Sequence, residues 1–311
     1  MKITVVVPNY NGERFLAECF DALKRQTFEG FESILVDNAS ADGSMELMLE
    51  RYPEVRCIRM KENTGFAAAV NAGVAASEAP FVALLNNDAI PEPGWLEALY
   101  RCIVKKKRVF SVSSKMIQYN DRTAIDDAGD GLTVGGNAFQ RGHGRHVSRY
   151  RRDARVFSSC GGAALYRRET LLALGGFDER FFAYLEDVEL SWRVWQSGRR
   201  VRYVPDAVVV HHYEFSRNAR KMYLLERNRA LFVLTCYGRR TLLLLGPALL
   251  AFEVAMLGLA VLQGWAGQKL AGWRWVLGHQ GWIRARRRAV QSARLVRDRD
   301  LAHLWETRFT A

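Results

Sequence analysis

An uninterrupted apolar run in the first third of the chain ends abruptly at a carboxylate. Residues 81–85 read Phe-Val-Ala-Leu-Leu, and Asn86, Asn87 and Asp88 follow at once. Apolar residues without polar alternation predict a parallel strand covered on both faces, and ligands of open α/β sheets bind outside the carboxyl ends of such strands. Asp88 is therefore a candidate functional acid. The alternative is a turn or helix-capping acid, because Asn and Asp favour both positions and Pro91 follows closely.

The first hundred residues alternate between patterns that are typical of strands and of helices. Strands are predicted at 3–7, 31–36, 55–59 and 81–85, and helices at 12–25, 44–52 and 67–76. Strands that alternate with helices of this length predict an α/β protein with a parallel, doubly wound sheet and right-handed crossovers. The carboxyl ends of all these strands should then meet at one edge.

The periodicity loosens after residue 108. Residues 119–156 are rich in glycine and arginine, which indicates a long loop that is functional or mobile. Its arginines would suit an anionic substrate, and a solvated surface loop is the alternative. Regular structure is predicted to resume at 156–166, with helices from Arg168 and at 186–197, and with a strand from 201 towards His211.

Cysteine usage and the N-terminus bear on the compartment. The five cysteines are scattered and form no C-x-x-C pair, which predicts free thiols in a reducing compartment and argues against structural zinc. The chain enters a strand at its third residue, so no secretory signal is predicted. We therefore expect a cytoplasmic protein.

The last quarter of the chain joins an apolar segment to a basic one. Residues 241–263 carry one charge, Glu253, and contain Pro247. Four tryptophans follow within residues 265–282, and residues 264–311 hold +7 of the formal net charge of +12. An apolar segment of this length can span a bilayer, and tryptophans followed by a basic cluster are typical of a cytoplasmic membrane interface. We expect association with an anionic membrane surface. Glu253 and Pro247 favour a broken, re-entrant or interfacial helix pair over a single span, and a buried helix of a soluble domain is the alternative.

Further polar residues fall at the predicted sheet edge. Asp37-Asn38 ends one strand and Asn63-Thr64-Gly65 follows another, but the chain has neither a G-x-G-x-x-G fingerprint nor a P-loop. Phosphates would therefore be held otherwise, most simply by a metal ion with oxygen ligands. Glu186-Asp187 opens a helix and His211-His212 ends a strand. The alternatives are acids that only complement the helix dipole and histidines that are only polar surface.

Six strings occur in order along residues 1–235: VVVPNYNG at 5–12, LVDNASADGS at 35–44, ENTGFAAAVNAG at 62–73, LLNNDA at 84–89, GGFDERFFAYLEDVELSWRVWQSG at 175–198 and VPDAVVVHHYEFS at 204–216. Together they resemble the family-2 inverting glycosyltransferases of GT-A fold, and most of all their rhamnosyltransferase-like branch. The resemblance implies a Rossmann-like mixed sheet with flanking helices at 1–235. Residues 1–105 would form the nucleotide-sugar-binding half, residues 106–235 the acceptor and catalytic half, and residues 236–311 a membrane-associating helical tail.

The resemblance also implies roles for single residues. Asp187 would be the general base, and Asp88 and His211 would bind a divalent cation, Mn²⁺ or Mg²⁺; Asn86 stands where the family's D-x-D element has its first acid. A nucleoside-diphosphate sugar would be bound by Pro8, Tyr10, Asp37, Asn38, Asn63, Gly65, Asn71, Asn87 and Asp88. The acceptor side would be formed by Gly161, Gly162, Glu186 and Trp192.

The expected reaction is inverting transfer of a sugar, first of all rhamnose from dTDP-rhamnose, to a hydroxyl of a glycan or polyprenyl-linked glycan at the inner face of the plasma membrane. A carboxylate takes the hydroxyl proton and the cation stabilises the leaving diphosphate. One alternative is a non-catalytic membrane-associated scaffold that binds nucleotide sugars. Another is a nucleic-acid-binding protein, suggested by the positive charge; the apolar segment before the basic tail favours lipid, so no nucleic acid is expected as a partner. The oligomeric state is left open.

Overall fold

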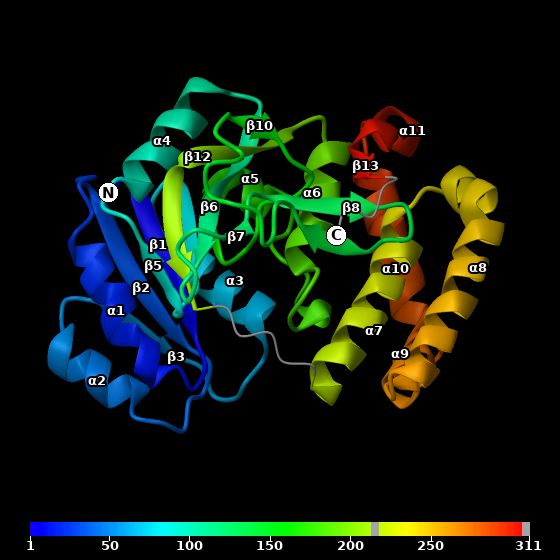
Figure 1. The fold of residues 1–311 in the computed structure, drawn as a ribbon, viewed down its shortest axis with the longest axis horizontal. Helices are drawn as coiled ribbons and strands as arrows, with labels where there is room; N and C mark the ends of the chain where they lie inside the picture. The colour runs from blue at the N-terminus through cyan, green and yellow to red at the C-terminus, as the bar shows by residue number, and fades with distance from the viewer. Residues whose placement is uncertain (213–217, 307–311) are drawn as a thin grey trace.

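The computed structural model describes residues 1–212 and 218–306. The end of the 204–216 motif and Arg308 of the basic tail lie outside the described residues. Figure 1 shows a twisted sheet flanked by helices, with long helices from the C-terminal part of the chain packed together at one side.

The first half of the molecule has the predicted alternation of strands and helices. Its four strands are β1 (Ile3–Asn9), β2 (Phe31–Asp37), β3 (Arg56–Arg59) and β4 (Phe81–Leu85), which run parallel in the order β4-β1-β2-β3. The crossover helices are α1 (Glu13–Lys24), α2 (Ser44–Arg51) and α3 (Phe66–Ala76). The predicted bounds of these strands and helices are confirmed to within a few residues. The prediction succeeds because both faces of the sheet are buried, so that the apolar pattern is clear. Val5 and Val7 pack with Leu16 of α1, whereas Val6 packs with Val70 of α3.

The second half departs from an all-parallel sheet. Strand β11 (Ala163–Arg167) lies between β4 and β6 (Val109–Gln118) and runs antiparallel to both. Strand β12 (Arg200–His211) is parallel to β6, with an irregular register between Tyr203 and Val208, and β5 (Ala89–Pro91) pairs antiparallel with its end. Helix α4 (Trp95–Lys105) covers β6 and β12. The sheet is therefore mixed, as the family resemblance implied, and the parallel arrangement predicted from the alternation of the first hundred residues holds for β1 to β4.

The segment expected to be one long irregular loop contains short strands. These are β7 (Ile125–Asp127), which pairs with β6, β8 (Asp130–Thr133) and β9 (Ala138–Gln140), which pair with each other, and β10 (Ala154–Arg155), which pairs with β12. Strands of two to four residues are too short to show alternation, so the sequence could not reveal them. They bury three acids, Asp126, Asp127 and Asp130.

The C-terminal part of the chain packs into the main core. Helix α7 (Ala219–Cys236) packs against α6 (Glu186–Gln196) and is covered by α9 (Ala266–Gly278) and α10 (Gln280–Ala293), and β13 (Trp305–Glu306) pairs with β8. Val276, Ile283 and Leu301 belong to the same buried cluster as Trp192 and Phe232. The helical tail expected from residue 236 is thus packed against the preceding residues. The short elements α5 (Arg168–Ala173), α11 (Asp298–Leu301), η1 (Glu179–Phe181) and η2 (Ala302–Leu304) complete the chain.

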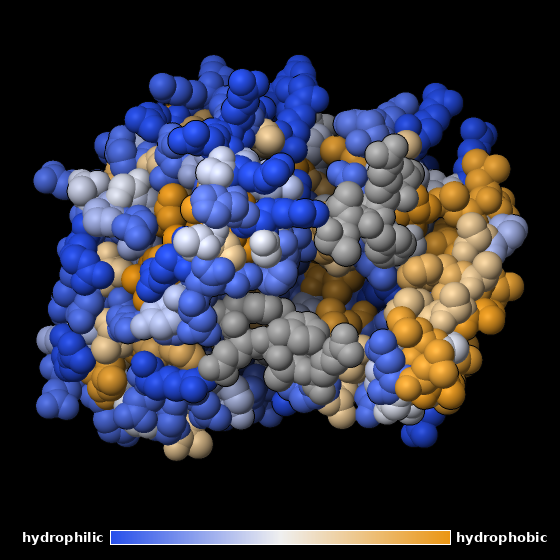
Figure 2. Space-filling view, viewed as in Figure 1, coloured by the Kyte–Doolittle hydropathy of each residue, from blue (hydrophilic) through white to orange (hydrophobic). Residues whose placement is uncertain are grey.

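Helix α8 (Arg239–Leu262) is the most exposed apolar element. It is continuous through Pro247 and, among the described residues, is the one helix long and apolar enough to cross a membrane; none of its apolar window is buried. Glu253 forms ion pairs with Arg229 of α7 at 2.5 Å and with Lys269 of α9 at 2.8 Å. One face of α8 is therefore tied to the protein. Figure 2 shows an apolar band where Figure 1 places this helix.

Candidate active site

Three neighbouring strands bring polar side chains to one edge of the sheet. The pairing of β1 with β2 sets Asn9 opposite Asp37. Asn9 Nδ2 donates to Asp37 Oδ1 at 3.1 Å, and Asn87 Nδ2 donates to Asn9 Oδ1 at 2.7 Å. The second Asp37 oxygen accepts from the Ser40 backbone N–H at 3.1 Å. The ends of β1, β2 and β4 thus meet, as predicted, and Asn9 holds the two expected donor-side residues in place.

A loop after β3 continues this edge. Asn38 Nδ2 donates to Asn63 Oδ1 at 3.1 Å and to the Gly65 carbonyl at 3.0 Å. Gly65 has φ +90°, and a Cβ atom there would lie 2.4 Å from the Phe182 carbonyl oxygen. Only glycine fits this close approach of two loops. Tyr10 is half exposed at the same edge, beside the partly buried Pro8.

Asp88 and His211 converge because strand β5 joins their segments. β5 pairs Ala89 with His211, and the His212 backbone N–H donates to the Asp88 carbonyl at 2.9 Å. Asp88 Oδ1 lies 3.2 Å from His211 Nε2. His211 Nδ1 in turn lies 2.7 Å from Asp126 Oδ2. A carboxylate–histidine–carboxylate row results, in which Asp126 orients the ring of His211.

The two carboxylates control the protonation of His211. Burial alone would lower its pKa, but the hydrogen bonds to Asp126 and Asp88 outweigh burial and raise the pKa to about 9. Asp126 was missed by the sequence analysis. Its signal was the acid-rich run Asp126-Asp127-Ala128-Gly129-Asp130, which was grouped with an irregular loop.

Asp187 lies half-buried at the start of α6, beside the buried acids Glu186 and Asp130. Its Oδ2 accepts from the Gly161 backbone N–H at 3.0 Å and its Oδ1 from the Val188 N–H at 2.8 Å. One polar atom each of Asp130, Cys160 and Asp187 lie within 4.8 Å of one another. Burial raises the pKa of Asp187, and burial together with the neighbouring carboxylates raises the pKa of Glu186 and of Asp130. Such surroundings favour a carboxylate that can take up a proton.

The turn before α6 is held in an uncommon backbone conformation. Phe182, Tyr184 and Leu185 all have positive φ, which costs free energy for residues other than glycine. Asn228 of α7 offsets this cost, because its Nδ2 donates to the carbonyls of Phe181, Ala183 and Tyr184 at 2.7–2.9 Å. The position of Asp187 therefore depends on a residue that the sequence analysis did not identify.

The family follows from comparison with known proteins. The sequence profile described as glycosyl transferase family 2 matches residues 4–175, more than half of the chain. The chain belongs to glycosyl transferase family 2. A curated relative, the N-acetylglucosaminyl-diphospho-decaprenol L-rhamnosyltransferase of Mycobacterium tuberculosis, is 31% identical over 228 residues, which cover 66% of this chain and 73% of the relative.

Solved structures share the fold of this family-2 glycosyltransferase. The mannosyltransferase PcManGT from Pyrobaculum calidifontis, in complex with GDP-Man and Mn²⁺, has a TM-score of 0.57 at 19% identity and covers 99% of this chain and 88% of its own. Staphylococcus aureus TarS in complex with UDP-GlcNAc has a TM-score of 0.55 at 19% identity, with 76% and 67% covered. The chain is a glycosyltransferase with the GT-A fold.

Two expected site residues of this glycosyltransferase lie elsewhere. Trp192 is fully buried in the core and its Nε1 donates to the Cys236 carbonyl, so it cannot line an acceptor site. Asn71 binds the Phe177 backbone through both ends of its amide and fastens α3 to the loop before η1. Both residues belong to strings that resemble the family. These strings contain residues of the core as well as residues at the sheet edge.

Gly161 and Gly162 link the two halves of the site. The Gly161 N–H binds Asp187, and the Gly162 carbonyl accepts from the Asn86 backbone N–H at 2.8 Å. A Cβ atom on Gly162 would lie 3.2 Å from the Asn86 side chain. The turn that carries Asp88 and the carboxylate of Asp187 are therefore anchored to the same pair of glycines.

Proposed function

We propose that this glycosyltransferase inverts the anomeric centre of its donor, with Asp187 as the general base and rhamnose from dTDP-rhamnose as the first candidate. The observation that carries the proposal is the shared anchoring of Asp187 and of the Asp88 turn to Gly161-Gly162. The rhamnosyltransferase relative supports the sugar. Asp187, half-buried and oriented by two N–H groups, would accept the proton of an acceptor hydroxyl as this oxygen attacks.

The donor would lie along the edge formed by β1, β2 and β4. Asp37 and Asn38 would bind the base and ribose, with Pro8, Tyr10, Asn63 and Gly65 at the walls of this subsite. Asn87, which donates to Asn9, would lie beside the diphosphate of the donor. The role of Asp37 is supported by its burial and by its fixed orientation, because both of its oxygens already accept hydrogen bonds from residues of the edge.

Asp88 and His211 would hold a divalent cation, Mn²⁺ or Mg²⁺. Their 3.2 Å separation fits two neighbouring ligands of one ion, which at bond lengths of about 2.1 Å lie about 3 Å apart. Asp126 would act behind His211, as carboxylates commonly do behind metal-binding histidines. When bound, the cation supplies charge stabilisation to the leaving diphosphate. The cluster of Asp130, Cys160 and Asp187 suits a hard cation less well, because it contains a thiol.

The acceptor would be a glycan or a lipid-linked glycan. Gly161, Gly162 and Glu186 would lie on its side of the site, next to Asp187. The M. tuberculosis relative is named for a decaprenol-linked acceptor. The exposed apolar face of α8 supports association with the inner face of the plasma membrane, where such lipids would be met. The basic residues gather beside this apolar helix, which favours lipid over nucleic acid.

The test is a screen of nucleotide sugars with purified enzyme and Mn²⁺ or Mg²⁺. We expect slow hydrolysis of a preferred donor, transfer to a lipid-linked acceptor, and loss of both with chelator. Product formed with retained anomeric configuration would contradict the inverting mechanism. Donor binding without turnover in the presence of membrane lipids and both cations would favour a non-catalytic scaffold.

A further inference from the structure

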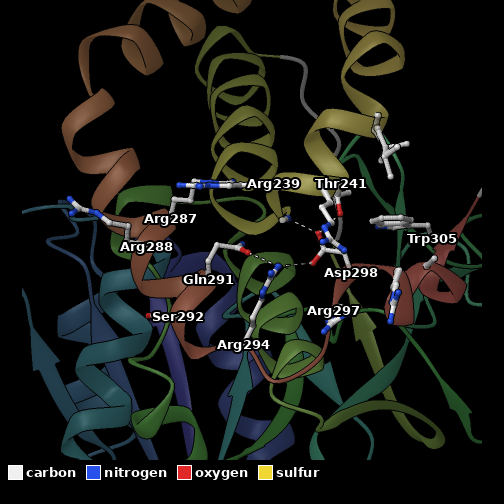
Figure 3. Close-up of a pocket in the computed structure, with 16 residues that line it drawn as sticks. Arg239, Thr241, Arg287, Arg288, Gln291, Ser292, Arg294, Arg297, Asp298 and Trp305 are labelled. Carbon is white, nitrogen blue, oxygen red and sulfur yellow. Dashed lines mark hydrogen bonds and ion pairs between the residues drawn. The ribbon is translucent and has the colours of Figure 1, made fainter.

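A basic cavity lies on the C-terminal helices. It has a volume of about 900 Å³ and is bounded by the start of α8, the second half of α10 and the segment around α11. Figure 3 shows Arg287, Arg288 and Gln291 of α10 on one side and Arg239 and Thr241 of α8 on the other. Arg240, Arg294, Arg297 and Arg299 also line the cavity, with Asp298 as the only acid among its lining residues.

The positive charge of this arginine pocket is not neutralised by the protein. Asp298 is already engaged, since its Oδ2 accepts from the Gly238 N–H at 2.5 Å and from Thr241 Oγ1 at 2.7 Å. Arg294 donates to Gln291 and lies 3.9 Å from Asp298. Four arginines of the pocket form no ion pair with a carboxylate within residues 1–212 and 218–306, and all four are exposed: Arg239, Arg240, Arg288 and Arg297. Unpaired guanidinium groups around one cavity favour a phosphate.

The apolar face of α8 begins at the rim of the same cavity. Leu244 and Leu245 line it, and Leu243 and Leu244 are 80% and 81% exposed. Leu250, Val254 and Val261 continue the exposed side of the helix. Positions 243, 250, 254 and 261 lie on one face of a helix, on a different side from Glu253, which forms ion pairs with α7 and α9. If a lipid phosphate occupied the pocket, its acyl chains could therefore lie along the exposed face of α8.

The pocket is separated from the reacting centre by the length of α6. Asp187 is at the first turn of this helix, whereas Gln196 at its end donates to Asp298 of the pocket. A helix of 11 residues is about 16 Å long. The acceptor's own diphosphate could not occupy the pocket while a hydroxyl of the adjoining sugar reaches Asp187.

We propose that the arginine pocket binds the phosphate head group of an anionic membrane phospholipid. The exposed face of α8 enters the acyl layer beside it, so the enzyme lies on the membrane without crossing it. This inference rests on the membrane association proposed above and adds to it a defined lipid site. An apolar helix at the rim distinguishes the pocket from a site for a soluble anion or for nucleic acid.

The test is flotation of the full chain with vesicles of phosphatidylcholine alone or with phosphatidylglycerol, at 0.15 M salt. We expect the wild type to float with phosphatidylglycerol vesicles. The variant with Arg239→Gln, Arg240→Gln, Arg288→Gln and Arg297→Gln should lose nearly three orders of magnitude in partition coefficient, at about fivefold per arginine. Donor hydrolysis in solution should be unchanged.

The matched control removes four exposed arginines from the sheet half, with Arg25→Gln, Arg56→Gln, Arg101→Gln and Arg108→Gln. It has the same net charge as the pocket variant and should float nearly as the wild type does. Pocket-variant flotation equal to wild type, or an equal loss in the control, would overturn the lipid site while leaving membrane association intact. A wild type that hydrolyses donor but floats with neither vesicle would overturn membrane association as well.

Two further arms identify the source of the phosphate. Dihexanoyl phosphatidylglycerol below its micelle concentration should raise the Tm of the wild type and of the control but not of the pocket variant. An equal rise with inorganic phosphate would show a general anion site and contradict the proposal. In the alternative outcome, the wild type binds only to phosphatidylcholine vesicles that carry polyprenyl diphosphate. If the pocket variant lost this binding, the pocket would be assigned to the acceptor.

Discussion

Asp187 combines two features that a general base requires. Its oxygens are oriented by the N–H groups of Gly161 and Val188, and burial raises its pKa, so that the carboxylate has a greater affinity for a proton than an exposed aspartate. Replacement Asp187→Asn keeps the shape of the side chain and removes the proton acceptor. We expect kcat to fall by about 10²–10⁴, with donor affinity near that of the wild type in calorimetric titration. Turnover at the wild-type rate would exclude Asp187 as the base.

The pH dependence of transfer follows from the same burial. A base acts only when deprotonated, and a raised pKa means that the active form is lost at a higher pH as the medium is acidified. Glu186, Asp130, Asp127 and Cys160 surround Asp187 and provide no positive charge that would oppose this shift. We expect kcat/KM to decline on the acid side at a higher pH than an ordinary Asp carboxyl, which titrates near about pH 4, would give. An acid limb at or below that ordinary value would contradict this assignment.

Asp126 offers a test of the metal site that leaves both proposed ligands in place. Asp126→Asn keeps a polar group beside His211 but removes the charge that orients the ring. We expect the Mn²⁺ affinity of the enzyme with bound nucleoside diphosphate to fall 10–100-fold, measured by calorimetry. Asp121→Asn, which changes an exposed acid of the same segment, is the control and should bind Mn²⁺ normally. Unchanged affinity in Asp126→Asn would argue against a cation on His211.

The single residues were predictable to different degrees. Asp88 and Asp37 could be found because each ends an apolar strand, and Asp187 because it opens a helix within a family string. Asp126 and Asn228 could not, because their roles depend on partners 85 and 44–47 residues away along the chain. Trp192 was misassigned because a family string does not reveal which of its side chains face the core.

Among the elements, the turn before α6 depends most on a distant support. Asn228→Ala would leave the carbonyls of Ala183 and Tyr184 without this donor, whereas the Phe181 carbonyl still accepts from Arg227. We expect a loss of about 2–4 kcal/mol in the free energy of unfolding and a fall in kcat, because Asp187 follows directly. Urea unfolding and single-turnover assays measure the two effects. Thr235→Ala, which removes another buried polar group from α7, should reduce stability slightly and spare kcat.

The elements were predictable where both faces of the sheet are covered. The strands and helices up to residue 85 show clear periodicity because each must bury its apolar residues. The short strands between 119 and 156 were not visible in the sequence, because they bury carboxylates and contain at most four residues. Strand β11 carries a clear apolar run, but its antiparallel direction is set by its position between β4 and β6.

At the scale of the molecule, the apolar tail has two different functions. Val276, Ile283 and Leu301 complete the core, whereas the exposed face of α8 contacts nothing in the described chain. Deleting residues 241–311 should therefore yield an unstable domain rather than a soluble one. The sequence showed a membrane-competent helix but not that the residues beyond it return to the core, since that depends on tertiary packing.

Point changes on α8 test membrane association without opening the core. The variant Leu243→Gln, Leu250→Gln and Val254→Gln should move from the membrane fraction to the soluble fraction with an unchanged Tm, because these side chains are mainly exposed. Each loses about 1.5–3 kcal/mol of burial in lipid. Leu49→Gln, at an equally exposed position of α2, should leave the distribution unchanged. Persistence of the α8 variant in membranes would exclude this helix as the anchor.

Helix α6 connects these scales. Its first turn carries Asp187, its middle is fixed to α10 by the pair of Glu189 with Arg286 at 2.8 Å, and its last residue contacts the arginine pocket. Such a helix does not shorten, so with a lipid bound in the arginine pocket, as proposed, it would hold the carboxylate of Asp187 at a set height above the head groups. The enzyme would then select its acceptors by their length. A glycan that is too short to reach that height from the bilayer would go unmodified however well its terminal sugar fits.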